Sequence, residues 1–379
     1  MKILITGDFC PRYRLKEMLD NGRYEDVFGQ VKPVFSQADY SIVNFECAVA
    51  SEQNVPIAKK GPNLLCSESA FLSLKWLGAD CVTLANNHFG DFGDEGVRQT
   101  IAVCKKNQVD YVGGGETLHE ASRTLYKTIG KEKIAVISCC EHEFNLASDT
   151  TGGSNHLDSV NQYYAIQEAK RNADYVIVIV HGGHEHYQLP SVRMTHLYRF
   201  FIDAGADAVV NHHQHCFSSY EMYHDRPIYY GTGNFCFDIS PVKTDDTWNY
   251  GYMVQLNLFH GEVSSEMIPY KQCAEKPLVE LLPPGSFDSK LQELCRITAD
   301  EQLLYRNNQL FYETSDELMS MMLNSNKNRF LRVLSRFLKA DQNFRDDYLL
   351  SLYNLVLCEA HRDKLTHFLE SRYQKLGEK

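Results

Sequence analysis

The chain has 379 residues, 44% hydrophobic and 23% charged, a composition that excludes disordered and fibrous proteins and allows a large core. The formal net charge of −11 argues against nucleic-acid binding, which needs a basic surface. No apolar run approaches the roughly 20 residues that cross a bilayer, so we expect no membrane span.

The N-terminus and the cysteines both predict a cytoplasmic protein, with removal of a leader as the alternative at the N-terminus. Residues 1–8 lead straight into an apolar strand pattern, without the charged and apolar regions of a signal peptide. The 12 cysteines are scattered through the chain without a CxxC pair, and only Cys139 and Cys140 are adjacent. This scatter is typical of free thiols in a reducing compartment rather than of a disulfide framework.

Up to about residue 240, short apolar runs alternate with amphipathic stretches of helix length. Strands are expected at residues 2–6, 40–44, 81–85, 111–113, 134–138, 175–180, 208–211 and 228–230. Helices are expected near residues 24–36, 68–77, 95–106, 160–172 and 191–204. This alternation predicts a layered α/β fold with buried sheets. Residues 251–259 and 263–270 read as a β-hairpin that closes the domain.

A proline-rich junction at Pro277 and residues 283–285 predicts a domain boundary. We expect an α/β domain at residues 1–280 and a helical domain at residues 285–379, which mediates an interaction or covers the substrate. Apolar residues of the second domain fall on one face of a helix at Phe330, Leu331, Leu334, Phe337 and Leu338. Arg329, Arg332 and Arg336 gather on another face, which is either solvated or a docking site for an acidic partner.

Polar side chains stand where five of the predicted strands end. They are Asp8, Asn44 and Glu46, Asn87 and His88, His181, His184 and Glu185, and finally His212, His213 and His215. In open α/β sheets, ligands bind at the carboxyl ends of the strands. A buried carboxylate or imidazole is costly unless it is paired or bound to a metal. Core packing therefore does not explain this pattern, which predicts a functional site.

The side-chain types indicate which ions this site would hold. Carboxylate, amide and imidazole ligands together suit Zn, Mn or Fe better than Ca or a thiolate cluster. Enough groups are present for one or two divalent ions, and two ions would share a carboxylate. His181, His213 and His215 are the strongest ligand candidates because of their spacing at the strand ends.

These motifs resemble the CapA family of bacterial capsule and poly-γ-glutamate synthesis proteins (PGA-cap), which are relatives of the calcineurin-like metallophosphoesterases. The matching segments are Gly7 and Asp8, residues 44–46, 86–88, 181–185 and 212–215, and the Gly-Asn-Phe of residues 233–235. They cover about residues 2–240 in the same order. The resemblance implies a metallophosphoesterase-like β-sandwich flanked by helices, here with a C-terminal all-helical extension.

The resemblance also implies a role for each matched residue. The implied metal ligands are Asp8, Glu46, Asn87, His181, His213 and His215, with Glu46 shared by two ions. The implied catalytic groups are His88, as general acid or stabiliser of negative charge, together with Glu46 and Glu185. The residues implied to face the substrate are Asn44, His184 and His212.

The chain departs from the family pattern in places. Phosphoesterases of this superfamily have Asp-x-His at the first strand, whereas Cys10 stands here in place of the histidine. Cys10 could supply a thiolate, although a packed thiol is the expectation. Asn211 and Gln214 stand where the family has Gly and Pro.

These features together predict a CapA-like metal-dependent hydrolase or transferase. Metal-activated water would attack a phosphoester or a (poly)glutamyl or peptide amide, so the substrate is a small molecule, a peptide or an anionic polymer. One alternative is a peptide or amino-acid epimerase that uses the same Asp, Glu and His pocket. Another is a non-catalytic accessory protein of polymer biosynthesis, whose helical C-terminal region binds a biosynthetic partner or forms a homodimer.

Overall fold

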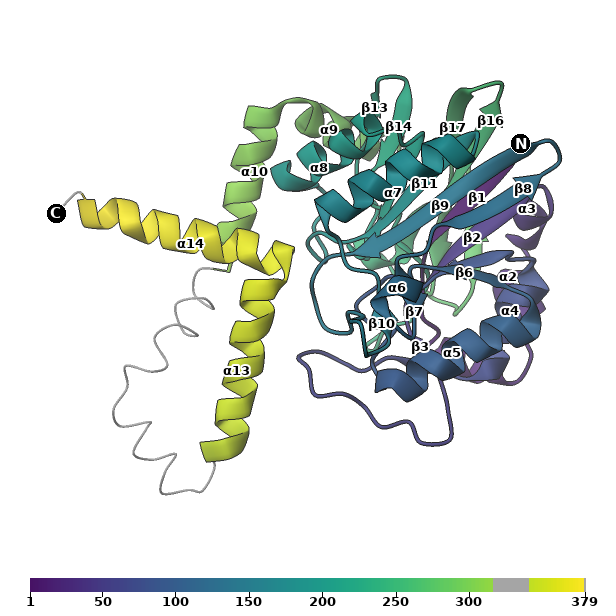
Figure 1. The fold of residues 1–379 in the computed structure, drawn as a ribbon, viewed down its shortest axis with the longest axis horizontal. Coiled ribbons are helices and arrows are strands. Elements are labelled where there is room, and N and C mark those ends of the chain that lie inside the picture. The colour runs from purple at the N-terminus through teal and green to yellow at the C-terminus, as the bar shows by residue number, and fades with distance from the viewer. Residues whose placement is uncertain (316–340, 378–379) are drawn as a thin grey trace.

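A computed structural model describes residues 1–315 and 341–377 of the chain. Two β-sheets pack against each other, helices cover the outer face of each, and the C-terminal helices stand at one side (Figure 1). This arrangement confirms the predicted fold class, an α/β sandwich flanked by helices with a C-terminal helical extension.

The first sheet combines a parallel half and an antiparallel half. Its strands in spatial order are β18 (Val279–Leu281), β17 (Glu262–Gln272), β16 (Tyr250–Phe259), β1 (Lys2–Phe9), β2 (Tyr40–Phe45), β5 (Cys81–Thr83) and β6 (Asp110–Val112). From β1 to β6 the strands are parallel, and β16 to β18 form the antiparallel half, which includes the predicted hairpin. The short strand β15 (Asn234–Cys236) pairs with the end of β1 and places Asn234 opposite Asp8.

The second sheet has a parallel centre. Its strands in spatial order are β13 (Tyr220–Tyr223), β14 (Arg226–Tyr229), β12 (Ala208–His212), β11 (Tyr175–His181), β9 (Glu132–Cys140) and β8 (Leu125–Ile129). The register between β11 and β12 puts His181 opposite His212. Because the neighbouring strands β9, β11 and β12 are parallel, their carboxyl ends meet at one edge of this sheet.

Alternating side chains explain why the strands of the first sheet read as continuous apolar runs. Ile3 and Ile5 of β1 face the core between the sheets, which they share with Ile177 and Val210 of the second sheet. Leu4, between them, faces the core under the outer helices. Successive residues of a strand point to opposite faces, so a strand that is buried on both faces shows no polar alternation.

Helices pack on both outer faces. Those on the first sheet are α1 (Tyr13–Asp20), α2 (Tyr24–Phe28), α3 (Lys32–Ser36), α4 (Glu68–Leu77) and α5 (Gly93–Asn107), and those on the second are α7 (Ser159–Asn172) and α8 (Val192–Asp203). The prediction of one helix over residues 24–36 was wrong. Two short helices stand there, because Pro33 lacks the N–H that a continuous helix needs and instead lies in the first turn of α3.

Short elements complete the path between these layers. They are α6 (Leu118–Ala121), η1 (Thr247–Asn249), β3 (Ala48–Val49), β4 (Leu65–Cys66), β7 (Gly114–Gly115) and β10 (Gly153–Ser154). β3 pairs with β4, and β7 pairs with β10.

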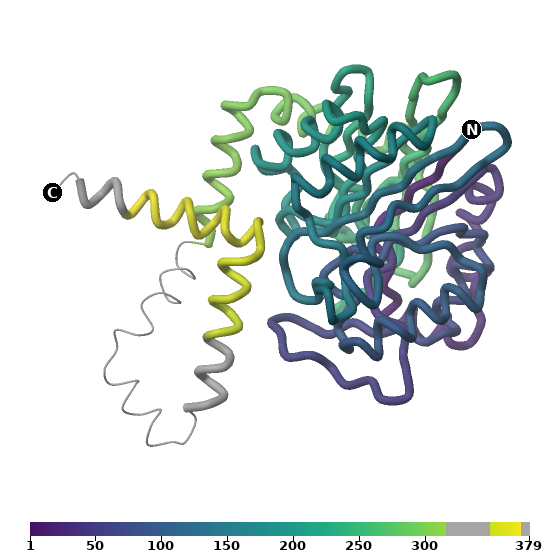
Figure 2. The backbone as a smooth tube through the Cα atoms, in the orientation of Figure 1, coloured from purple at the N-terminus to yellow at the C-terminus, as the bar shows by residue number. Residues whose placement is uncertain are grey.

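The region after residue 285 is helical where the structure describes it. Its helices are α9 (Asp288–Ala299), α10 (Glu301–Glu313), α13 (Asp341–Leu357) and α14 (Glu359–Gly377), and the last two stand beside the sandwich in Figure 2. Leu291, Leu294 and Ile297 of α9 belong to the core between the sheets. The division into residues 1–280 and 285–379 stays a prediction, and this packing ties the start of the second part to the first.

The predicted apolar face at Phe330, Leu331, Leu334, Phe337 and Leu338 and the arginine stripe at Arg329, Arg332 and Arg336 lie outside the described residues. All twelve cysteines are free thiols, and Cys139 and Cys140 are buried at the end of β9. Among residues 1–315 and 341–377, no helix has both the length and the apolar character needed to cross a bilayer. The cytoplasmic location stays a prediction.

Gly7 occupies a position with no room for a side chain. A Cβ there would lie 1.8 Å from the carbonyl oxygen of Gly233, where β15 passes beside Asp8. We predict that Gly7→Ala lowers the free energy of unfolding by about 3 kcal/mol or more, since two backbones must separate. Urea denaturation measures this change.

Gly78→Ala is the matched control for that substitution. A Cβ at Gly78 meets nothing within 4 Å, and its φ of +97° costs only about 1–2 kcal/mol of left-handed strain. Equal losses in the two variants would contradict the close approach of β1 and β15.

Candidate metal centre

The structure brings the six predicted metal ligands together at the ends of the strands. Asp8 and His181 are the last or next-to-last residues of β1 and β11, and the others lie in the loops that follow β2, β5 and β12. The six residues are all buried: Asp8, Glu46, Asn87, His181, His213 and His215. They come from both sheets, so the centre lies where the two sheets meet.

One group of ligand atoms gathers around His181. Its Nε2 lies 3.1 Å from Nδ1 of His213, 3.0 Å from Oδ1 of Asn87 and 3.5 Å from Oε1 of Glu46. Ligands that each lie about 2.0–2.1 Å from one ion are separated by about 3–3.4 Å. These four side chains therefore fit a single divalent ion.

A second group shares Glu46 with the first. Asp8, Glu46 and His215 place ligand atoms within 4.8 Å of one another. Nδ1 of His215 lies 3.4 Å from Oδ2 of Asp8, and its Nε2 lies 3.8 Å from Oε1 of Glu46. Cys10 is not in this group, because it packs in the hydrophobic cluster under the outer helices. Glu46 is thus placed as a bridging carboxylate would be.

The carboxylates of this centre lack the partners that burial demands. Oδ2 of Asp8 and both carboxylate oxygens of Glu46 are buried without a hydrogen-bond partner. Burial raises the pKa of Glu46 well above its usual value, and the nearby Asp8 raises it further. Uncompensated buried carboxylates cost several kcal/mol, and a cation between them removes that cost. The residues present therefore fit divalent metal ions.

Two residues predicted to face the substrate, Asn44 and His212, lie beside Asp8. Nδ2 of Asn44 donates to Oδ1 of Asp8 at 2.7 Å and lies 3.2 Å from Nδ1 of His181. Nδ1 of His212 lies 2.9 Å from the hydroxyl of Thr232 and 3.8 Å from Oδ1 of Asp8. Neither Asn44 nor His212 is among the residues that line the cavity described below, and their role toward a substrate stays a prediction.

The backbone of the histidine loop is strained. His213 has a φ of +89° and His215 a φ of +55°, in the left-handed region that non-glycine residues rarely adopt. Asn234 of β15 fixes this loop, since its Oδ1 lies 2.9 Å from Nδ1 of His215 and its Nδ2 donates to the His215 carbonyl at 3.1 Å. Strain of this kind persists where the surrounding structure demands a particular side-chain position.

Asn211 and Gln214, which depart from the family pattern, have structural roles. Nδ2 of Asn211 donates to the carbonyl oxygens of Gly182 and Tyr230, both at 2.9 Å. Nε2 of Gln214 donates to the carbonyl oxygen of Tyr187 at 2.8 Å. Both residues thus tie together the two loops that carry the histidines, and neither departure removes a ligand.

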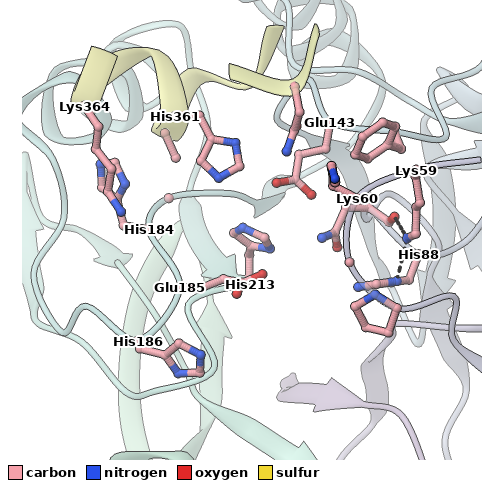
Figure 3. Close-up of a pocket in the computed structure, with 17 residues that line it drawn as sticks. Lys59, Lys60, His88, Glu143, His184, Glu185, His186, His213, His361 and Lys364 are labelled. Carbon is pink, nitrogen blue, oxygen red and sulfur yellow. Dashed lines mark hydrogen bonds between the residues drawn. The ribbon is translucent and has the colours of Figure 1, made fainter. Parts of the chain in front are cut away.

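A cavity of about 470 Å³ opens beside the centre (Figure 3). Its wall includes Asn87, His88, His184, Glu185 and His213 of the predicted site. Glu185 is solvent-accessible within it. The cavity walls desolvate the Glu185 carboxylate and raise its pKa, but His215 and His213 outweigh this and lower the pKa to about 2. Glu185 therefore carries a negative charge at neutral pH.

His88 is held by a buried ion pair that sequence analysis did not find. Nδ1 of His88 lies 2.7 Å from Oδ2 of Asp91 and 3.0 Å from Nζ of Lys59, and Lys59 and Asp91 also pair with each other. Burial lowers the pKa of His88, Asp91 raises it and Lys59 lowers it, with a net lowering. The spacing of Asp91 three residues after His88 could have indicated it, whereas nothing in the sequence points to Lys59.

The C-terminal helices supply one wall of the cavity, which sequence analysis did not predict in detail. The N-terminal half of α14 is anchored by Glu359 with His142 at 2.7 Å, and by Asp363 with Arg193 at 3.2 Å and His184 at 3.5 Å. Arg193 also pairs with buried Glu141 at 2.8 Å. This anchoring places His361 and Lys364 of α14 in the cavity wall (Figure 3).

The fold and this centre define an α/β sandwich with metal-ligand groups at its strand ends. A family model described as bacterial capsule synthesis protein PGA_cap matches residues 2–239. The chain is 30% identical over 292 residues to the capsule biosynthesis protein CapA of Bacillus anthracis, covering 74% of this chain and 70% of that one. It is 30% identical over 255 residues to the PGA biosynthesis protein CapA of Bacillus subtilis (strain 168), covering 66% and 67%. The chain therefore belongs to the PGA_cap family of bacterial capsule synthesis proteins, which confirms the resemblance.

Among solved structures, a hypothetical protein from Thermus thermophilus is similar with a TM-score of 0.45 at 15% identity. The match covers 75% of this chain and 100% of that chain. A likeness this distant supports no inference about activity.

The unpaired carboxylate of Glu46 should make the metal-free protein less stable. We predict that Glu46→Gln raises the free energy of unfolding of chelator-treated protein by about 1–3 kcal/mol, because burial raises the pKa of Glu46 and folding at neutral pH therefore has to protonate or desolvate this carboxylate, a cost that Gln avoids. Urea denaturation, with and without added Mn²⁺, measures this effect. Mn²⁺ should stabilise the wild type but not the variant.

The exposed Glu17 provides the control. Glu17→Gln should change neither the free energy of unfolding in chelator nor the stabilisation by Mn²⁺. A Glu46→Gln protein that is less stable than the wild type in chelator would show that Glu46 has an undetected partner.

Proposed function

We propose that the protein is a metal-dependent hydrolase or transferase of capsule or polyglutamate biosynthesis. Its substrate would carry a phosphoester, or a glutamyl or peptide amide. The observation that supports this most is Glu46, whose unpaired carboxylate is shared by two ligand groups at the side of a cavity. When bound, a pair of divalent ions lowers the pKa of water and polarises the reacting oxygen of a substrate.

The two ligand groups define which residues would hold each ion. Asp8, Glu46 and His215 would hold one, and Glu46, Asn87, His181 and His213 the other. These oxygen and nitrogen ligands suit Mn, Zn or Fe. Asn44 and Asn234 orient the ligands through hydrogen bonds to Asp8 and His215.

His88 is positioned to handle a proton at the substrate. Asp91 and Lys59 occupy its Nδ1, which leaves Nε2 as the nitrogen that can reach a substrate in the cavity. When Nε2 carries the proton, as in the tautomer whose Nδ1 accepts from Lys59 or in the protonated ring, His88 would donate a hydrogen bond to developing negative charge or a proton to the leaving group. Asp91 and Lys59 fix the plane of the ring, so the nitrogen stays aimed at one place.

The cavity wall suits an anionic substrate. Lys59, Lys60, His361 and Lys364 line it, and although Glu143 and Glu185 lie on the same wall, divalent ions at the adjoining centre would add positive charge. Phosphoryl groups and the carboxylates of a glutamyl chain are the anions that such a wall attracts. The anchored α14 supports the view that the C-terminal helices cover bound substrate. Binding of a partner or a second copy through this region stays a prediction.

Removal of one histidine should empty the ligand group around His181. Protein purified without added metal or chelator is expected to lose at least one equivalent of transition metal in His213→Ala, because only Asn87, His181 and Glu46 then remain. Asp8→Ala tests the other group in the same way. Elemental analysis per chain measures both, beside the exposed control His119→Ala.

A wild-type protein that holds no metal, and takes up none on titration with Mn²⁺ or Zn²⁺, would contradict the metal-dependent proposal.

His88 should affect turnover rather than metal content. His88→Asn is expected to lower kcat on the best substrate found among phosphoesters and glutamyl amides by about 100- to 10,000-fold, because general acid–base catalysis is lost. Metal content should remain that of the wild type. The exposed His224→Asn is the control and should change neither value.

If the fully metal-loaded wild type hydrolyses none of these substrates, the enzymatic proposal fails, and an accessory role in polymer biosynthesis takes its place.

A further inference from the structure

A third group of metal-competent side chains lies in the part of the cavity wall that the C-terminal helices build. Glu143, Cys358 and His361 place one carboxylate oxygen, one thiol and one imidazole nitrogen within 4.8 Å of one another. Glu143 follows β9, and the other two stand at the junction of α13 and α14. Figure 3 shows Glu143 and His361 next to each other on the wall. None of the three belongs to the groups around Glu46.

The spacing of this group fits a tetrahedral ion. Sγ of Cys358 lies 3.6 Å from Oε1 of Glu143. A Zn–S bond of about 2.3 Å and a Zn–O bond of about 2.0 Å at a tetrahedral angle separate the two ligand atoms by about 3.5 Å. An ion can therefore bind between Sγ of Cys358 and Oε1 of Glu143 with almost no change in the distance between these two atoms.

The surroundings of Cys358 favour a thiolate only if a cation is present. Burial, followed by Glu143 and Glu141, raises the pKa of this thiol well above its usual value, and the backbone amides of His361 and Ala360, in the first turn of α14, lower the pKa by less. A bound metal ion would lower the pKa of the Cys358 thiol instead, because a thiol that coordinates a metal is deprotonated.

A fourth polar group near this site has no partner within the described chain. Oδ1 of Asn354 is buried without a hydrogen bond, and Asn354 lines the same cavity one helical turn before Cys358. Buried amide oxygens are nearly always hydrogen-bonded, so an unpaired one indicates a ligand or a bound water. This observation is independent of the three-residue group and indicates a bound molecule in the cavity that Glu143 and His361 also line.

We propose that Glu143, Cys358 and His361 form a third metal site, which prefers Zn²⁺ to Mn²⁺ and ties the C-terminal helices to the sandwich. Thiolate and imidazole ligands select Zn²⁺, whereas Mn²⁺ favours oxygen ligands. The site spans residues about 215 positions apart in the sequence, as the Cys358 to Glu143 contact does. An ion there holds α14 in place together with the ion pairs of Glu359 and Asp363. The inference does not depend on the proposed hydrolase activity, because its ligands are separate.

Titration of the full chain with Co²⁺ tests this site through its sulfur ligand. A thiolate bound to Co²⁺ gives a charge-transfer absorption in the near ultraviolet, and the groups around Glu46 contain no cysteine. The band should appear in the wild type and in His213→Ala, and disappear in Cys358→Ser. Cys295→Ser, which removes a partly exposed thiol elsewhere, should keep it. Zn²⁺ should displace the band, and Mn²⁺ should not.

Glu143→Gln provides a second variant in case Cys358→Ser fails to fold, which circular dichroism would reveal. Its affinity for Co²⁺ should fall at least about tenfold, the loss that even outer partners of a ligand cause. Elemental analysis after Zn²⁺ exposure should find one equivalent fewer in His361→Ala than in the wild type. Absence of the band in the wild type, or its persistence in Cys358→Ser, would overturn the proposal. Loss of metal in His213→Ala alone reports on the other centre, so the two proposals fail separately.

Discussion

The burial of Asp8 and Glu46 is the constraint around which the rest of this structure is arranged. Two carboxyl groups at the ends of neighbouring parallel strands have lost their water, and the nearby Asp8 together with burial raises the pKa of Glu46, so this arrangement is costly unless a proton or a cation compensates it. Histidines approach these carboxylates from the second sheet. This approach requires the carboxyl ends of the parallel strands of both packed sheets to lie at the same end of the sandwich. The left-handed backbone of His213 and His215 is the conformational cost of that approach.

The sequence allowed the sandwich and the position of the centre to be predicted because both depend on local patterns. Strands buried on both faces leave long apolar runs, and a polar residue directly after such a run stands out. The strand that ends in His181 and the helix at Glu68–Leu77 are examples in which the pattern and the structure agree closely. The prediction of one helix over residues 24–36 was wrong because it followed the apolar periodicity alone. It did not take into account that Pro33 interrupts the backbone hydrogen bonds of a continuous helix.

Other parts of the site depend on contacts that leave no local pattern. The pair of His142 and Glu359 joins residues 217 positions apart, and the pair of Arg193 and Asp363 joins residues 170 apart. Each charged residue alone is indistinguishable in sequence from a solvated one on a helix surface. The sequence does not indicate the role of Lys59 either, since only the three-dimensional structure shows that it is buried beside Asp91. The predicted role of His212 illustrates the same limit: its place in a histidine run indicated the centre but not which side of Asp8 it would take.

The cavity has a floor and a wall of different origin. The floor comes from strand ends within residues 2–239, the part that matches the family model, while His361 and Lys364 come from α14, far beyond it. One cavity is therefore built from two separate stretches of the chain. Substitutions at His361 and Lys364 change the charge and shape of its wall without touching the strand ends that carry the candidate metal ligands. If the proposed reaction takes place there, the choice of substrate and the reaction itself can change independently.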